Sequence, residues 1–148
     1  MTISRKEVQS ALDRVTAKVP DLTSRMPKIG GPPLDGIVTI EIGDDGELML
    51  VAHERGMNTI NYSTRDLDDL VHQATLHAVW GLALSWERLN RDRFPEYRGE
   101  TRVTRVAKEI DVMRRIDLRW AEELRASIPQ KYPGVTVDRV DAHPILSS

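Results

Sequence analysis

The sequence predicts an α+β fold in which a small antiparallel β-meander of about three strands packs against two long helices, with a further helix at the N-terminal end. Apolar and polar residues alternate over 36–62, whereas apolar residues recur every three or four positions over 65–90 and 101–127. Because the strands cluster and the long helices follow them, this order favours α+β over a parallel nucleotide-binding sheet. The 148 residues, 40% hydrophobic and 30% charged, predict a single soluble globular domain over 1–148.

Residues 1–34 predict a helix followed by a linker. Ser4 and Glu7 have the spacing of a capping box, and the apolar residues after them keep helical spacing until Pro20. A helix is therefore expected over Arg5 to Lys18. Residues 19–35 contain four prolines and two glycines, a composition typical of a linker or a long loop.

Residues 35–63 predict the β-meander. Val38, Ile40 and Ile42 alternate with more polar neighbours over 36–43, and the same alternation returns over 47–54. The turn Asp44-Asp45-Gly46 joins these two segments, and Arg55-Gly56 leads to a third, shorter strand over 57–62. Three consecutive antiparallel strands follow from this pattern.

Residues 64–128 predict two long helices. Ser63 or Thr64 is expected to cap the first, over about 65–90, whose opening turns are acidic as the helix dipole favours. The second is expected over about 101–127 and ends before Pro129. Residues 129–148 fit either a C-terminal tail or one short strand at 135–138.

Catalytic and metal-binding patterns are sparse. The chain has no cysteine, no nucleophile elbow and no phosphate-binding glycine loop. His72 and His77 are five residues apart on one helix, so they point in different directions and do not form a helical zinc pair. We therefore expect no metal, no cofactor and no enzymatic activity.

Location and partner class follow from charge and hydropathy. The N-terminal residues lack the apolar region of a signal peptide, and the longest uncharged stretch, 70–86, is shorter than a membrane span. The 21 basic and 23 acidic residues leave a net charge of −2, which gives no overall attraction to nucleic acid. These features predict a cytoplasmic protein that binds neither membrane nor nucleic acid.

Glu87 and Arg91 are predicted to form a structural ion pair, because they lie four residues apart on the most apolar helix. The alternative is a buried Glu87 with a raised pKa that acts as a general base. On the next helix, arginines such as Arg105 alternate with acids such as Glu109 and Asp111, a mixture typical of a solvated face.

Residues 35–63 carry six acidic residues and one basic residue, so this segment is the most acidic part of the chain. One interpretation is simple solvation of exposed turns. The other is a partner-binding surface that steers a basic protein. Its candidate residues are Glu41, Asp44, Asp45, Glu47 and Glu54.

Residues 64–134 resemble a family of bacterial polymorphic-toxin immunity proteins. The resemblance lies in four short motifs: Asp66-Leu67-Asp68-Asp69-Leu70, Trp86-Glu87 with Arg91, Trp120-Ala121 and Lys131-Tyr132-Pro133. In that family, a strand-turn-strand unit leads into a helix with an acidic start. The resemblance implies an antitoxin in bacterial competition, which binds a cognate toxin domain in the cytoplasm and inhibits it by protein–protein contact.

Two other functions are compatible with the residues. The first is a small acidic cytosolic adaptor or secretion chaperone that forms a homodimer through helix 65–90. The second is an enzyme with Glu87 in a closed polar pocket.

Overall fold

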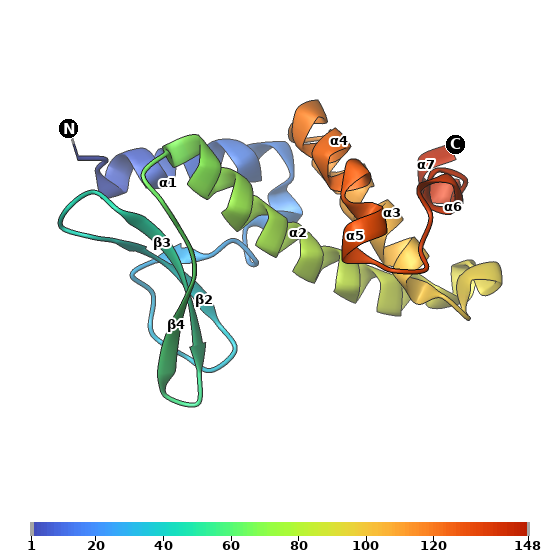
Figure 1. Ribbon diagram of the computed structural model, residues 1–148, viewed down its shortest axis with the longest axis horizontal. Coiled ribbons are helices and arrows are strands. Elements are labelled where there is room, and N and C mark those ends of the chain that lie inside the picture. The colour runs from blue at the N-terminus through green and yellow to red at the C-terminus, as the bar shows by residue number, and fades with distance from the viewer. Residues whose placement is uncertain (1, 148) are drawn as a thin grey trace. The chain divides into compact units, whose positions relative to one another are not determined.

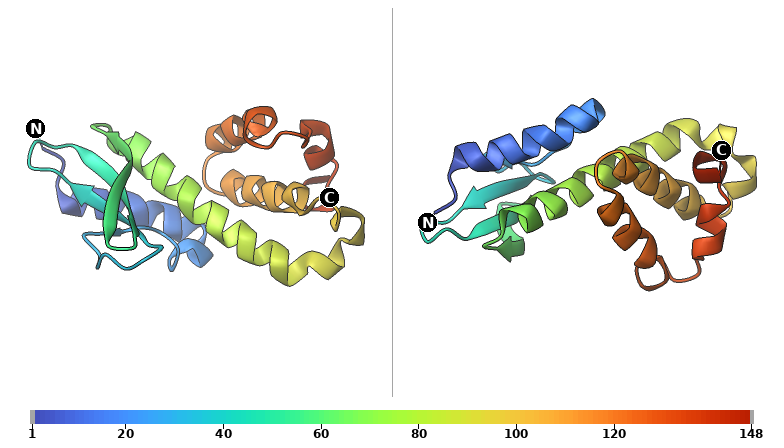
Figure 2. Two further views of the ribbon diagram at one scale, coloured as in Figure 1. Left: turned by 60° about the horizontal axis from the view of Figure 1, so that its bottom comes forward. Right: turned by 90° about the horizontal axis from the view of Figure 1, so that it is seen from above.

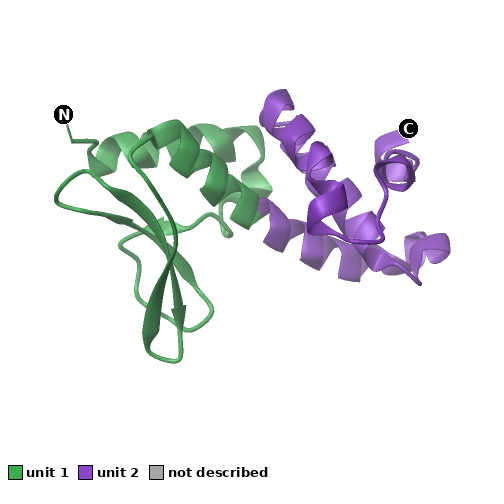
Figure 3. Ribbon diagram, viewed as in Figure 1, with its two compact units in different colours: residues 1–78 green, residues 79–148 purple. Residues whose placement is uncertain are grey.

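The computed structural model of the protein describes residues 2–147 and confirms the α+β class. The chain divides into two compact units, and the boundary falls between Ala78 and Val79, inside the long helix α2 (Leu67–Asn90) (Figure 3). The N-terminal unit contains the sheet, and the C-terminal unit is helical. A single folding domain stays a prediction, because two compact units can still unfold together.

Helix α1 (Arg5–Lys18) opens the N-terminal unit at the predicted residues. The Ser4 hydroxyl accepts a hydrogen bond from the Glu7 backbone N–H, and the Glu7 carboxylate accepts one from the Ser4 backbone N–H. This capping box satisfies two N–H groups that have no partner within the helix. A 3₁₀ turn, η1 (Pro20–Leu22), follows directly.

The sheet has four strands in the order β1-β2-β3-β4: β1 (Lys28–Ile29), β2 (Val38–Ile42), β3 (Leu48–Glu54) and β4 (Met57–Thr64) (Figure 1). The last three form the predicted antiparallel meander, whereas β1 is an additional strand that pairs parallel with β2. The sequence pattern missed β1 because only two residues pair, and Gly30 turns the chain with φ +60° directly afterwards.

One face of the sheet forms the core of this unit. Ile40, Leu48 and Leu50 are buried on it. Helix α1 and the first turns of α2 lie over this face, as Figures 1 and 2 both show. The alternation in the sequence therefore predicted correctly which strand residues share the apolar face.

Strand β4 contains a β-bulge. Leu50 pairs with Tyr62 and Val51 with Ile60, so Asn61 is an extra residue on β4. After the end of the strand, Asp66 directly precedes α2, and its carboxylate accepts the Asp69 backbone N–H at 3.0 Å. Asp66 therefore caps α2, and the prediction of Ser63 or Thr64 as the cap was wrong by two residues or more.

The C-terminal unit continues from α2 through two 3₁₀ turns, η2 (Arg91–Arg93) and η3 (Pro95–Tyr97), into α3 (Thr101–Arg114). The predicted single helix over 101–127 is in fact two, because α4 (Leu118–Ala126) is separate. Asp117 is extended, and its carboxylate accepts the backbone N–H groups of Arg119 and Trp120. This N-cap starts a new helix in a different direction.

Three short helices complete the unit: α5 (Ile128–Lys131), α6 (Val137–Asp141) and α7 (Pro144–Ser147). Residues 135–138 are thus neither a tail nor a strand, since the Thr136 hydroxyl caps α6 by accepting the Arg139 backbone N–H. Helices α4, α6 and α7 all contact α3 (Figure 2). Helix α3 is therefore the central element of this unit.

Candidate functional site

The β2–β3 turn presents an acidic tip, which we define as Asp44, Asp45 and Glu47. Asp44 and Asp45 are exposed, and Glu47 is half-buried. The Arg65 guanidinium donates to the Asp45 carbonyl at 2.7 Å and to its carboxylate at 2.8 Å. Together with the Glu47 backbone N–H, which is the larger cause, Arg65 holds the pKa of Asp45 below its usual value. The Asp45 carboxylate is thus ionised, and the tip is anchored to Arg65, two residues before the start of α2.

The other two predicted partner-binding residues, Glu41 and Glu54, lie on the strands. Glu54 ends β3, seven residues from Glu47, which corresponds to about 24 Å along an extended strand. Glu41 is on β2, where its carboxylate accepts a hydrogen bond from the Thr39 hydroxyl at 3.0 Å. Glu54 is therefore far from the tip, whereas Glu41, whose partner on β3 is Met49, lies close to the β2–β3 turn.

A polar network occupies the sheet face opposite to the core. The His53 ring contacts the Thr39 hydroxyl through Nε2 at 2.8 Å and the Asn58 side-chain oxygen through Nδ1 at 2.7 Å. Thr39 and His53 are buried, and with Glu41 they link β2, β3 and β4. No motif in the sequence indicated a role for His53. The available signal was its position on β3 in alternation with Val51.

In the C-terminal unit, Arg91 forms a bidentate contact with Glu87. Its Nε and Nη2 donate to the two carboxylate oxygens at 2.9 and 2.7 Å. The Glu87 side chain is buried, and the Arg91 hydrogen bonds hold the pKa of Glu87 below its usual value. The alternative of a Glu87 with a raised pKa was therefore wrong, which removes the basis for Glu87 as a general base.

The acid with a raised pKa is Glu109 on α3. Burial raises the pKa of Glu109 to about 7, although Arg105 and Lys131 oppose the shift. The Glu109 carboxylate is 3.9 Å from Arg105 Nε, and the Arg105 guanidinium lies over the Tyr132 ring. The expectation of a solvated face was wrong here, because Glu109 lies four residues before Met113 and three after Val106, on the apolar side of α3.

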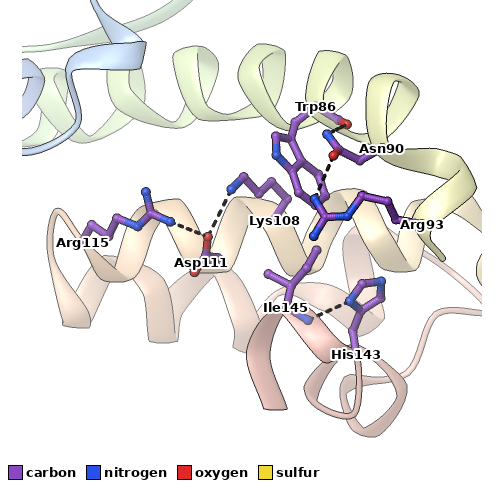
Figure 4. Close-up of polar contacts among 8 residues, drawn as sticks. All are labelled: Trp86, Asn90, Arg93, Lys108, Asp111, Arg115, His143 and Ile145. Carbon is purple, nitrogen blue, oxygen red and sulfur yellow. Dashed lines mark hydrogen bonds and ion pairs between the residues drawn. The ribbon is translucent and has the colours of Figure 1, made fainter. Parts of the chain in front are cut away.

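Trp86 lies between two cations in the same unit (Figure 4). Lys108 Nζ is 4.6 Å from the Trp86 ring centroid, and the Arg93 guanidinium is 5.8 Å from it. Asn90 ties this arrangement to α2, since its amide donates to the Trp86 carbonyl and accepts from Arg93. Lys108 also contacts Asp111, so these cations have partners within the unit.

His143 is neutral and lies among aromatic side chains of the C-terminal unit. Its Nδ1 accepts the Ile145 backbone N–H at 3.1 Å (Figure 4), so the ring proton is on Nε2, which donates to the Thr104 hydroxyl. Phe94 and Tyr97 pack against the ring, and burial lowers the pKa of His143 to about 4. His143 is thus a structural residue that joins α3 to the C-terminal helices.

The described part of the chain offers few groupings for small-molecule chemistry. No three histidine or acidic side chains among residues 2–147 are arranged to hold a metal ion. No helix in that range is long and apolar enough to cross a membrane. A groove of about 460 Å³ lies beside α1 in the N-terminal unit, with Arg5, Asp13 and Lys28 in its lining.

The sequence of this α+β chain matches the model of a protein family described as Immunity protein 63, over residues 44–130. The match spans more than half of the 148 residues, and the chain belongs to the Immunity protein 63 family. The resemblance drawn from residues 64–134 is thereby confirmed, and the matched region also includes β3 and β4. No curated protein and no solved structure matches the chain.

Proposed function

We propose that this protein is an immunity protein that binds a cognate toxin domain in the cytoplasm and inhibits it by direct contact, without catalysis of its own. The observation that carries the proposal is membership of the Immunity protein 63 family. The matched residues include the acidic tip, β3, β4 and the whole of α2. These elements hold the exposed acidic and apolar side chains that protein contact requires.

The acidic tip is the part of the surface that we propose faces the toxin. Asp44 and Asp45 are exposed, and Arg65 anchors the turn, so little order has to be gained on binding. A toxin with a basic cleft for an anionic substrate would meet complementary charge here. Glu54, at the other end of β3, would add to the long-range field without joining the same contact.

Protection of cells tests the proposal. The tagged full-length protein would be used to capture its stoichiometric partner from native lysate, and the partner's C-terminal domain would then be co-expressed with the protein in a sensitive host. We expect the domain to kill cells when expressed alone and the protein to restore growth. Toxicity that persists with the protein present at equal amounts would refute the immunity function.

The adaptor or chaperone function would use a homodimer through residues 65–90. Trp80 is 44% exposed and Leu89 is 85% exposed on this helix. Nine residues separate them, which corresponds to about half a turn around a helix, so they do not form one apolar face. This geometry favours the immunity function. A salt-resistant dimer in light scattering would instead support the chaperone.

A further inference from the structure

Strand β4 is an edge of the sheet. It pairs with β3 on one side, and no other strand among the described residues pairs with its second side. The β3–β4 turn is the end of this hairpin that lies farthest from α1 (Figure 1). Backbone groups on the outer side of an edge strand are available to pair with another chain.

The composition of β4 leaves this edge unprotected. Natural edge strands are commonly guarded by lysine, by other charged residues or by proline. The eight residues of β4, Met57 to Thr64, contain no charged residue and no proline. Met57 is 71% exposed and Ile60 is 58% exposed. The bulge at Asn61 is a protective feature of the second half, so the first half, 57–60, is the open part.

The direction of the backbone groups identifies the residues that would pair. His53 donates its backbone N–H to Ile37 and accepts the Gly36 N–H at its carbonyl, so its backbone groups point toward the β2 side. Its partner on β4 is Asn58. In an antiparallel pair, two such residues direct their N–H and C=O groups away from each other, so those of Asn58 point to the free edge. Ile60, two residues on and before the bulge, has the same orientation.

Charge decides between the possible occupants of the edge. Residues 35–63 carry six acidic residues and one basic residue, so a second copy of β4 would bring two strongly acidic segments together. A basic segment would instead gain attraction from the same field. We propose that the 57–60 edge of β4 receives an extended, net-basic strand of the partner protein by β-strand addition. The partner is the toxin domain only if the proposed function holds.

Variants at Ile60 test the edge in the full-length protein. Ile60→Pro removes the outward N–H, and Ile60→Lys keeps it but adds a guarding charge. Ile60→Thr is the matched control, because it keeps the N–H and the β-branch. Against the captured toxin domain, we expect Kd to rise at least tenfold for the first two variants and less than threefold for the control. Unchanged Kd in both Ile60→Pro and Ile60→Lys would overturn strand addition while the immunity function stands.

A synthetic peptide tests strand pairing at the β4 edge without the toxin. A ten-residue peptide of alternating lysine and valine, added to the isotope-labelled protein, should shift the backbone amide signals of Asn58 and Ile60 and slow their hydrogen exchange at least tenfold. Signals that move only at Asp44 and Asp45 would overturn the proposal, because they would show attraction without strand pairing. Failure of the toxin protection assay leaves this readout intact, so the two failures are distinguishable.

Discussion

The two units differ in what their charged residues do. Residues 1–78 carry 8 basic and 12 acidic residues, whereas residues 79–148 carry 13 and 11. In the N-terminal unit, exposed acids gather on the sheet turns, and the 57–60 edge of β4 is uncharged and open. In the C-terminal unit, Glu87, Glu100 and Asp141 each contact an arginine. The comparison indicates that the N-terminal unit serves partner contact and that internal charge pairs stabilise the C-terminal unit.

The largest expected effect concerns Glu109. This buried carboxylate is poorly paired, so it is an exception to the charge pairs that stabilise the C-terminal unit. Its folded pKa of about 7 exceeds the ordinary glutamate pKa of 4.5, so the folded state binds more protons than the unfolded state between these two pH values. The free energy of unfolding should therefore fall as pH rises from about 4.5 to about 7, by up to about 3 kcal/mol.

Glu109→Gln should remove that fall in stability, because the amide stays neutral. The variant should match the wild type near pH 4 and exceed it at pH 8, as measured by urea unfolding at both pH values. Glu96→Gln, at an exposed position, is the control and should follow the wild type. A Glu109→Gln variant less stable than wild type at pH 8 would contradict the ionised, poorly paired carboxylate described here.

The next effect concerns the Glu87–Arg91 pair. Arg91→Ala leaves a buried carboxylate without its two hydrogen bonds and should cost about 2 kcal/mol, less than a fully buried pair because Arg91 is 47% exposed. Arg98→Ala, which breaks the exposed contact with Asp92, should cost less than about 1 kcal/mol. Thermal unfolding of both variants measures the difference.

A second substitution separates lost pairing from lost packing. If the cost of Arg91→Ala comes from the unpaired Glu87 carboxylate, adding Glu87→Leu should recover much of the stability. A double variant as unstable as Arg91→Ala alone would instead assign the cost to packing of the arginine side chain. The C-terminal unit would then depend less on charge pairing than the comparison indicates.

Elements with a repeated pattern were predictable from the sequence. The faces of β2 and β3 and the start of α1 followed from alternation and from the Ser4–Glu7 spacing. Features that depend on one local contact were not predictable from the sequence. Asp117 interrupts the predicted helix over 101–127 although the apolar spacing continues across the break, because its carboxylate caps a new helix. Periodicity records which residues are apolar and does not record a change of direction.

Candidate site residues were predictable only in part, for a related reason. The i,i+4 spacing of Glu87 and Arg91 already indicated the contact seen in the structure. Burial of Glu109 and His53 depends on neighbours from distant segments, such as Tyr132 and Thr39. Charge patterning treats every acid on a mixed face as solvated, so it missed Glu109.

A kinetic prediction sharpens the role of the N-terminal unit. Reversing the acidic tip with Asp44→Lys, Asp45→Lys and Glu47→Lys should slow association with the captured toxin domain about tenfold at low salt. The difference should shrink at higher ionic strength because exposed charges are screened. Stopped-flow association at two salt concentrations measures both. An unchanged on-rate at low salt would show that the tip does not steer the partner.

The smallest expected effect shows whether the acidic tip or the net charge of the N-terminal unit steers association. Arg65→Ala removes the cation that pairs with Asp45 and should alter stability by less than about 1 kcal/mol, because the pair is exposed. It makes the tip more negative, so association with a basic partner should quicken about twofold. Arg55→Ala removes the same charge at the far end of β3 and is the matched control. Equal acceleration in both variants would assign steering to net charge, whereas slower association in Arg65→Ala would show that the anchored shape of the turn matters more than its charge.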